Sequence, residues 1–140
     1  MPTPPDTAGP LEVDWGGLRA EAVRAAAAAY SPYSHLAVGA AAVCVDGRRI
    51  TGCNVENASY GLALCAECIL VGQLRQTGGG ALLAVACRSG AGELLMPCGR
   101  CRQLLYEHGG AALLVDTPQG PLPMSQLLPH AFGPEQLPGA

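Results

Sequence analysis

Apolar positions along the chain repeat with helical spacing in some segments and form continuous short runs in others. Leu18, Ala22 and Ala25 fall on one stripe behind Asp14, which can cap a helix running to about Tyr30. Two later segments with helical spacing, at about 65–77 and 98–108, are each followed by glycines that can end a helix. Pro97 is expected in the first turn of the helix at 98–108. The pattern predicts four helices, at about 14–30, 65–77, 98–108 and 125–128.

Short apolar runs between these helices are typical of buried strands. The Asp46-Gly47 pair separates two such runs, which indicates a β-hairpin. The turn at 89–92 is expected to lead into a short partner strand. The other strands are predicted at about 37–45, 48–54, 82–88 and 112–116. Helices alternating with strands in this order predict an α/β fold, a three-layer α/β/α domain with a mixed five-stranded sheet.

Length and composition limit what this domain can be. The 140 residues, 49% of them hydrophobic, fit a single domain at 14–137 behind a proline-rich mobile leader at 1–13. The longest apolar run, Ala81 to Cys87, is far shorter than the roughly 20 residues that cross a membrane. The N-terminus lacks the features of a signal peptide, which favours a cytoplasmic protein. A net charge of −3 offers no footprint for nucleic acid, so a small-molecule substrate is expected.

Three of the seven cysteines have a spacing that suits a metal ion. Cys98 and Cys101 stand three positions apart at a predicted helix start, which places both sulfurs on one helix face. Cys65 stands at the start of another predicted helix. Helix N-termini favour thiolates, and three thiolates can hold Zn²⁺ while one tetrahedral position stays open for water. An open position is typical of a catalytic zinc site rather than a structural one.

Glu67 supplies the group that such a zinc site needs for catalysis. It follows Cys65 by two residues, so its carboxylate can stand beside water bound at the metal and move protons to a substrate. Zinc lowers the pKa of its bound water to about 7, which makes hydroxide available at neutral pH. These residues predict hydrolytic attack on an electrophilic carbon.

Other interpretations of the cysteines stay open. Cys68 could be the fourth ligand of a structural Cys₄ zinc site, although Glu67 would then have no role. The Cys98–Cys101 pair by itself also fits a redox pair or two packed thiols. The cysteines on predicted strands are expected in the core, and they are Cys44, Cys53 and Cys87.

Four sequence blocks match a known pattern together, at 33–39, 52–61, 98–103 and 127–133. They resemble the cytidine deaminase family in its small, three-cysteine form, over about 14–137. The resemblance implies zinc-dependent hydrolytic deamination of cytidine and deoxycytidine to uridine and deoxyuridine, with release of ammonia, in pyrimidine salvage. It also implies one zinc ion per subunit, held by Cys65, Cys98 and Cys101, with Glu67 as the catalytic proton carrier.

The resemblance assigns further residues to the nucleoside. It implies that Asn54 and Glu56 hydrogen-bond the ribose hydroxyl, a role that an amide and a carboxylate suit. The backbone N–H of Ala66 would meet the carbonyl of the base. Leu36 stands where the family usually carries a phenylalanine against the pyrimidine, so an apolar wall is kept without the aromatic face.

Subunit contacts and one unusual position complete the likeness to the family. This form is typically a homotetramer with shared active sites, in which Tyr60 matches a residue near the shared site and Phe132 matches an aromatic that stacks on the base from another subunit. Many members carry an arginine directly after the Cys-Ala-Glu motif, where it hydrogen-bonds the thiolates, and here that position is Cys68. Arg100 and Arg102 are the candidates to replace this cation.

Three other functions are weighed against nucleoside deamination. A deaminase of a cytosine-containing antibiotic shares the second zinc block, but the ribose block at 54–57 favours a plain nucleoside. The negative net charge disfavours a deaminase that edits polynucleotides. A non-catalytic zinc or redox module would carry the same cysteines, but it would have no activity for Glu67→Gln to abolish.

Overall fold

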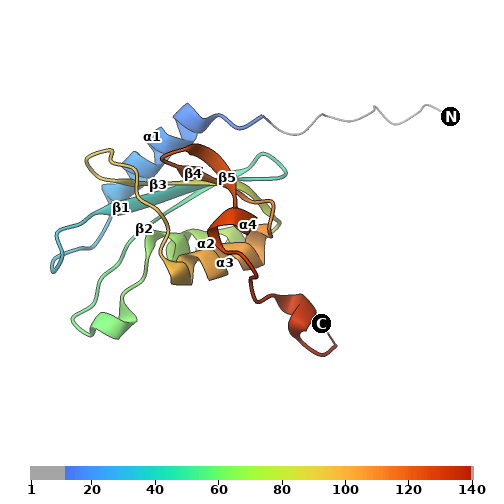
Figure 1. Cartoon of the computed structure of the whole chain (residues 1–140). Coiled ribbons are helices and arrows are strands. Elements are labelled where there is room, and N and C mark those ends of the chain that lie inside the picture. Colours follow the sequence, from blue (N-terminus) through green and yellow to red (C-terminus); the bar gives the residue numbers. More distant parts are fainter. Residues whose placement is uncertain (1–11, 140) are drawn as a thin grey trace.

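The protein is described by a computed structural model over residues 12–139, which shows an open sheet with helices on both faces (Figure 1). The helices are α1 (Trp15–Ala26), α2 (Ala66–Gln76), α3 (Gly99–Gly109) and α4 (Met124–Leu127). The strands are β1 (Val38–Cys44), β2 (Arg49–Cys53), β3 (Leu82–Ser89), β4 (Leu114–Thr117) and β5 (Gly120–Pro123). Two 3₁₀ turns, η1 (Tyr60–Leu62) and η2 (Pro134–Gln136), lie in the loop after β2 and near the C-terminus.

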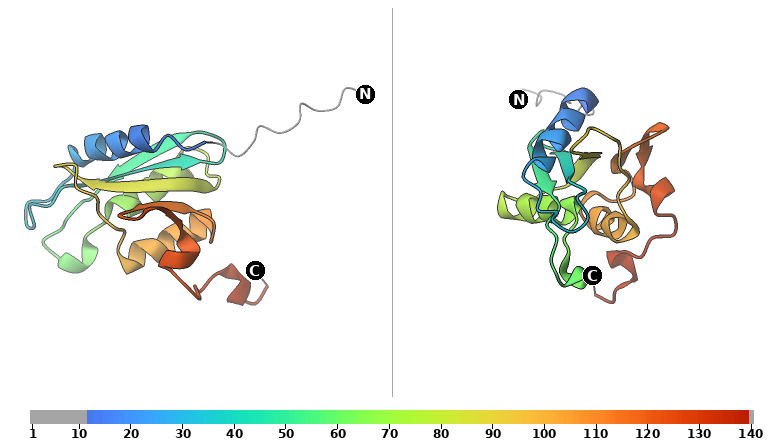
Figure 2. Two further views of the ribbon diagram at one scale, coloured as in Figure 1. Left: turned by 45° about the horizontal axis from the view of Figure 1, so that its top comes forward. Right: turned by 90° about the vertical axis from the view of Figure 1, so that its left-hand side faces the viewer.

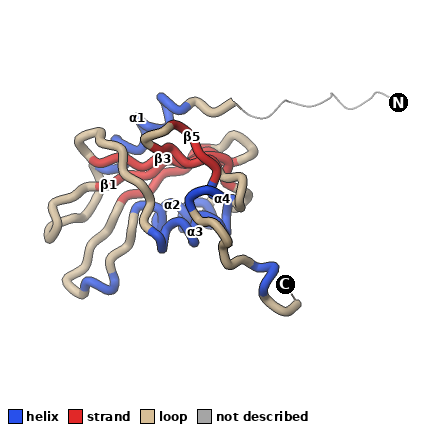
Figure 3. The backbone as a smooth tube through the Cα atoms, viewed as in Figure 1, coloured by secondary structure: helices blue, strands red, loops and turns tan. Residues whose placement is uncertain are grey.

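The strands form one sheet in the order β2-β1-β3-β4-β5. Adjacent strands pair antiparallel except for β3 and β4, which run parallel because α3 forms the crossover between them. Helix α1 covers one face of the sheet, and α2 and α3 lie next to each other on the opposite face (Figures 2 and 3). The predicted α/β fold, three layers around a mixed five-stranded sheet, is confirmed.

Strand β1, which lies between β2 and β3, contributes to a core on each face of the sheet. Ala40, Ala42 and Cys44 belong to the core beneath α2 and α3, whereas Ala41 and Val43 belong to the core beneath α1. Successive side chains of a strand point to opposite faces, and both faces of β1 are covered. The strand is therefore a continuous apolar run instead of an alternation of apolar and polar residues.

Helix α1 begins where the sequence predicts and ends one turn earlier. The carboxylate of Asp14 accepts a hydrogen bond from the Gly17 N–H at 3.0 Å, which confirms the predicted cap. The helix ends at Ala26 and not near Tyr30. The backbone of Tyr30 exchanges hydrogen bonds with the chain after β2, donating to the Asn54 carbonyl and accepting from the Glu56 N–H. These long-range bonds replace the helical ones.

The fifth strand of the sheet is a different segment from the one predicted. The chain after 89–92 makes only a single bridge between Arg88 and Leu94. The fifth strand is β5, in a proline-rich segment for which no strand is predicted. Proline lacks a backbone donor, but an edge strand leaves one side of its backbone unpaired, so Pro121 and Pro123 are tolerated there.

Most of the predicted N-terminal leader, residues 1–11, lies outside the described residues. Of the remainder, Val13 packs against the core beneath α1. The extent of the single domain over 14–137 stays a prediction. None of the helices between residues 12 and 139 combines the length and the apolar character needed to cross a membrane.

Gly52 allows α2 to lie directly on β2. A Cβ atom at this position would lie 2.3 Å from the carbonyl oxygen of Ala66 and 2.5 Å from the backbone nitrogen of Leu70. We expect Gly52→Ala to lower the free energy of unfolding by about 1–3 kcal/mol, because rigid backbone must move apart. Urea denaturation measures the change.

Gly72→Ala is the matched control on the same helix. Gly72 is exposed within α2, and a Cβ there meets nothing within 4 Å. Alanine in a helix interior is favoured over glycine by about 0.5–1 kcal/mol, so this variant should be more stable than the wild type. If both variants kept the free energy of unfolding of the wild type, the close approach of α2 to Gly52 would be contradicted.

Candidate active site

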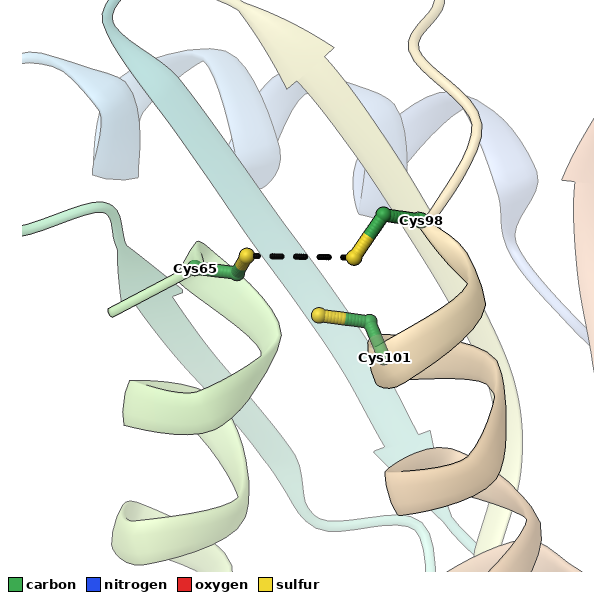
Figure 4. A group of neighbouring side chains, drawn as sticks. All are labelled: Cys65, Cys98 and Cys101. Atoms are coloured by element: carbon green, nitrogen blue, oxygen red, sulfur yellow. Dashed lines mark hydrogen bonds between the residues drawn. The ribbon is translucent and has the colours of Figure 1, made fainter. Parts of the chain in front are cut away.

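Three cysteine sulfurs meet at the adjacent N-terminal ends of α2 and α3 (Figure 4). Cys65 is the N-cap residue of α2, Cys98 is the N-cap residue of α3, and Cys101 lies one turn further along α3. The Cys65 and Cys98 sulfurs are 4.0 Å apart, and all three sulfurs lie within 4.8 Å of one another. Pro97 precedes the N-cap, so it lies just before α3 and not in its first turn as predicted.

The arrangement of these sulfurs fits a zinc ion. Zinc–sulfur bonds of about 2.3 Å in a tetrahedron place the sulfurs roughly 3.8 Å from one another, close to the spacing here. Soft sulfur donors at two helix N-termini are the chemistry that zinc prefers. Among the described residues, Cys68 does not join this cluster, so the structure does not support a Cys₄ site.

The three clustered thiols differ in how readily they ionise. Burial raises the pKa of Cys101 well above that of an ordinary thiol, and the charge of Glu67 raises it further. Burial also raises the pKa of Cys65. At Cys98 burial acts in the same direction, but hydrogen bonds from the Cys101 N–H and other donors at the start of α3 outweigh it and lower the pKa. A metal ion must therefore displace protons from Cys65 and Cys101, and its affinity should fall as the pH falls.

Glu67 is a buried carboxylate in the first turn of α2. Its side chain is only 4% exposed, and it lines the same cavity as Cys65 and Cys98. Its Oε1 atom accepts a hydrogen bond from the thiol of Cys87 at 3.0 Å. The carboxylate is thus fixed beside the sulfur cluster without being one of the clustered ligand atoms.

A cavity of about 290 Å³ opens in front of Glu67 and the sulfurs. Asn54 and Glu56 line this cavity, and their side chains hydrogen-bond the backbone of residues 33–38. The amide of Asn54 accepts from the Val38 N–H at 2.8 Å and donates to the Leu36 carbonyl at 2.9 Å. Glu56 Oε1 accepts the backbone N–H groups of Tyr33 and Ser34 at 3.0 and 3.1 Å. Hydrogen bonds from Ser34 lower the pKa of Glu56, so it is ionised at neutral pH.

Comparison with known proteins agrees with this geometry. A family model described as the cytidine and deoxycytidylate deaminase zinc-binding region matches residues 17–116. The chain is 62% identical to the cytidine deaminase of Mycobacterium tuberculosis over 127 residues, which cover 91% of this chain and 96% of that protein. The chain belongs to the cytidine and deoxycytidylate deaminase family.

Solved structures of cytidine deaminases share its fold. The enzyme from Mycobacterium tuberculosis superimposes with a TM-score of 0.85 at 63% identity, covering 87% of this chain and 99% of that chain. The enzyme from Mycobacterium leprae superimposes with a TM-score of 0.83 at 60% identity, covering 84% and 99%. The predicted family, enzyme class and fold are confirmed.

The structure brings most of the predicted site residues of this deaminase together. Seven of the predicted site residues line the cavity. They are Leu36, Asn54, Glu56, Cys65, Ala66, Glu67 and Cys98. Cys101 completes the sulfur cluster behind them. The lining also includes Leu95 and Met96, which the sequence motifs did not single out. The individual roles of all these residues stay predictions.

Tyr60 and Phe132 do not line this cavity in their own chain. Tyr60 is 79% exposed in η1, and its ring meets that of Tyr33 edge to face at 6.3 Å between centroids, in a neighbouring hollow that shares Glu56. Phe132 is 57% exposed on the C-terminal segment, which extends away from the sheet (Figure 1). Both side chains are therefore largely exposed on this chain.

Arg102 is already engaged elsewhere in the deaminase fold. It donates to the carbonyl oxygens of Pro97 and Leu127 at 2.9 and 3.0 Å, which ties the start of α3 to α4. Arg100 reaches the Ala63 carbonyl at 3.5 Å. Within residues 12–139 neither guanidinium group donates a hydrogen bond to a clustered sulfur, and the replacement of the usual arginine by one of them stays a prediction.

Cys87 has a contact that the sequence did not reveal. It is buried on β3, as expected, but its thiol faces Glu67. Strand periodicity places Val85 and Cys87 on the same face, and both belong to the core beneath α2 and α3. Periodicity assigns a face of the sheet but does not say which residue of the helix lies opposite.

Proposed function

We propose that this protein catalyses the zinc-dependent hydrolytic deamination of cytidine and deoxycytidine, a reaction of pyrimidine salvage. The products are uridine or deoxyuridine and ammonia. One zinc ion per subunit would be held by Cys65, Cys98 and Cys101. The observation that carries the proposal is the cavity itself, because it places Glu67 and the sulfur cluster opposite two side chains suited to a sugar, Asn54 and Glu56.

Glu67 is the proton carrier in this proposal. When bound, zinc supplies a Lewis acid that makes water a stronger acid and a source of nucleophile at neutral pH. Glu67 takes a proton from water and gives it to the ring nitrogen of the pyrimidine, which makes the neighbouring C4 more electrophilic. The hydroxide left from that water adds to C4. Glu67 then moves the proton of the added hydroxyl to the amino group, and the C4–N bond breaks to release ammonia as the C4 carbonyl forms. Burial of the carboxylate keeps bulk water away from these transfers.

The rest of the cavity orients the nucleoside. The Ala66 N–H lies in the first turn of α2, where a backbone donor lacks a helical partner, and it would donate to the carbonyl of the base. Asn54 and Glu56 would bind the ribose, held in place by their own bonds to segment 33–38. Leu36 would provide an apolar wall without the extra attraction of an aromatic ring.

We further propose a homotetramer with shared active sites. Large apolar side chains are exposed on the loops near the cavity and on the C-terminal segment, and they include Tyr33, Tyr60, Leu62 and Phe132. A second subunit would cover them, and Phe132 would reach the base bound in a neighbour's cavity. Light scattering of the purified protein gives the mass that tests this assembly.

The loss of ultraviolet absorbance on deamination tests the proposed activity. We expect turnover of cytidine and deoxycytidine, release of ammonia, and loss of turnover with a zinc chelator. Free cytosine should react with a kcat/KM at least about 100-fold lower, because the ribose contacts no longer help to reach the transition state. Protein that carries one zinc per chain but is inactive on both nucleosides would overturn the proposal.

A further inference from the structure

A buried thiol from the sheet lies against the carboxylate of Glu67. The thiol of Cys87 lies 3.0 Å from Oε1 of Glu67, and Cys87 itself is only 3% exposed. Cys87 does not line the cavity, so it lies behind the carboxylate as seen from the substrate. It comes from β3, in the middle of the sheet, whereas Glu67 comes from α2.

We propose that Cys87 is a positioning residue for Glu67. Its S–H donates to Oε1 and holds the carboxylate beside the sulfur cluster, so that the second oxygen serves the water molecule and the pyrimidine. This inference rests on the proposed function, in which Glu67 moves protons. It adds a residue from the middle of the sheet to proposed catalytic and metal-binding residues that lie at helix starts.

The environment of the pair makes Cys87 the donor. Burial raises the pKa of the Cys87 thiol well above its ordinary value, and the charge of Glu67 raises it further, so the sulfur keeps its proton. A buried carboxylate without a hydrogen-bond donor is costly, and each donor it finds also restricts its rotamers. Glu67 therefore gains both stability and a fixed direction from one contact.

The position of Cys87 on β3 limits the movement of its thiol, and so of the Glu67 carboxylate. Strand β3 pairs with β1 along its length, with Cys87 opposite Ala40, and the Cys87 carbonyl also accepts a hydrogen bond from the Leu95 N–H at 3.2 Å. A donor on such a strand moves less than one on a loop. A proton carrier that must alternate between water, the ring nitrogen and the amino group requires placement within a fraction of an ångström.

Three variants test the inference, with Cys44→Ala as the matched control. Cys44 is another fully buried thiol in the same core, on β1, and it has no contact with Glu67. We expect Cys87→Ala to lower kcat for cytidine by about tenfold, with KM changed by less than about twofold and one zinc still bound per chain. Cys87→Ser should recover kcat to within about threefold of the wild type, because its hydroxyl can donate to the same oxygen. Cys44→Ala should leave kcat unchanged.

A spectroscopic measurement checks the hydrogen bond without relying on turnover. The infrared S–H stretching band of each thiol is isolated by subtracting the spectrum of its variant from that of the wild type. The Cys87 band should lie at lower wavenumber than the Cys44 band, because an S–H that donates to a carboxylate is weakened. A Cys87 band at or above that of Cys44 would overturn the inference.

The outcomes separate this inference from the proposed function. If the wild type does not deaminate nucleosides, the proposed function fails, and the position of the Cys87 band still decides whether the contact exists. If the wild type is active and Cys87→Ala keeps its full kcat, the proposed function stands and the positioning role is wrong. The same loss of kcat in Cys44→Ala and Cys87→Ala would show a general effect of the core, which also refutes that role.

Discussion

Glu67→Gln is expected to lower kcat for cytidine by at least about 10²–10⁴-fold, the range typical for loss of a general acid–base group. Glutamine has nearly the same shape as glutamate, and its amide oxygen can still accept the hydrogen bond from the Cys87 thiol. It cannot carry protons between water, the ring nitrogen and the leaving amino group. KM should change little, because the groups proposed to hold the sugar and the base are untouched. Steady-state kinetics with cytidine measure both constants.

Two further results make this expectation specific. Zinc content should stay at one per chain, because Glu67 is outside the cluster of ligand sulfurs. Glu107→Gln removes an equal charge from an exposed position on α3 and should leave kcat unchanged. A Glu67→Gln enzyme that retains a tenth or more of wild-type kcat would show that protons move by another route.

Local rules predict only part of the sulfur cluster. Cys98 and Cys101 must share a helix face wherever that helix lies, and both Cys65 and Cys98 precede residues that start helices. That two helix starts meet could not be derived from spacing alone. It depends on the crossover between β3 and β4, which lays α3 beside α2.

The features that the sequence did not predict depend on contacts between distant segments. The contact of Cys87 with Glu67 joins a strand to a helix 20 residues away, and strand alternation predicts only the face. The strand at Gly120–Pro123 was hidden by its prolines, which usually mark loops but are allowed at a sheet edge. Helix α1 ended early because Tyr30 bonds to the chain after β2. Each of these features depends on a tertiary contact that local patterns do not specify.

Cys101→Ala is expected to remove zinc and activity together. Cys101 is the fully buried member of the sulfur cluster, and alanine leaves two sulfurs, one of them exposed. Loss of a partner outside the ligand sphere already weakens metal binding by about 10–100-fold, so loss of a ligand should cost at least about 100-fold. Zinc content after dialysis and a competition titration with a chromophoric chelator measure the change.

Cys68→Ala is the matched control, and it decides between two kinds of zinc site. Cys68 lies on the same helix as Glu67 but outside the sulfur cluster, so its removal should preserve zinc and activity. Loss of zinc in this variant would instead indicate four cysteine ligands and a structural metal, with no position left for a reacting water.

The zinc affinity of the wild type should also decrease from pH 8 to pH 6. Burial raises the pKa values of Cys65 and Cys101, so protons compete with zinc for these sulfurs more strongly as the pH falls.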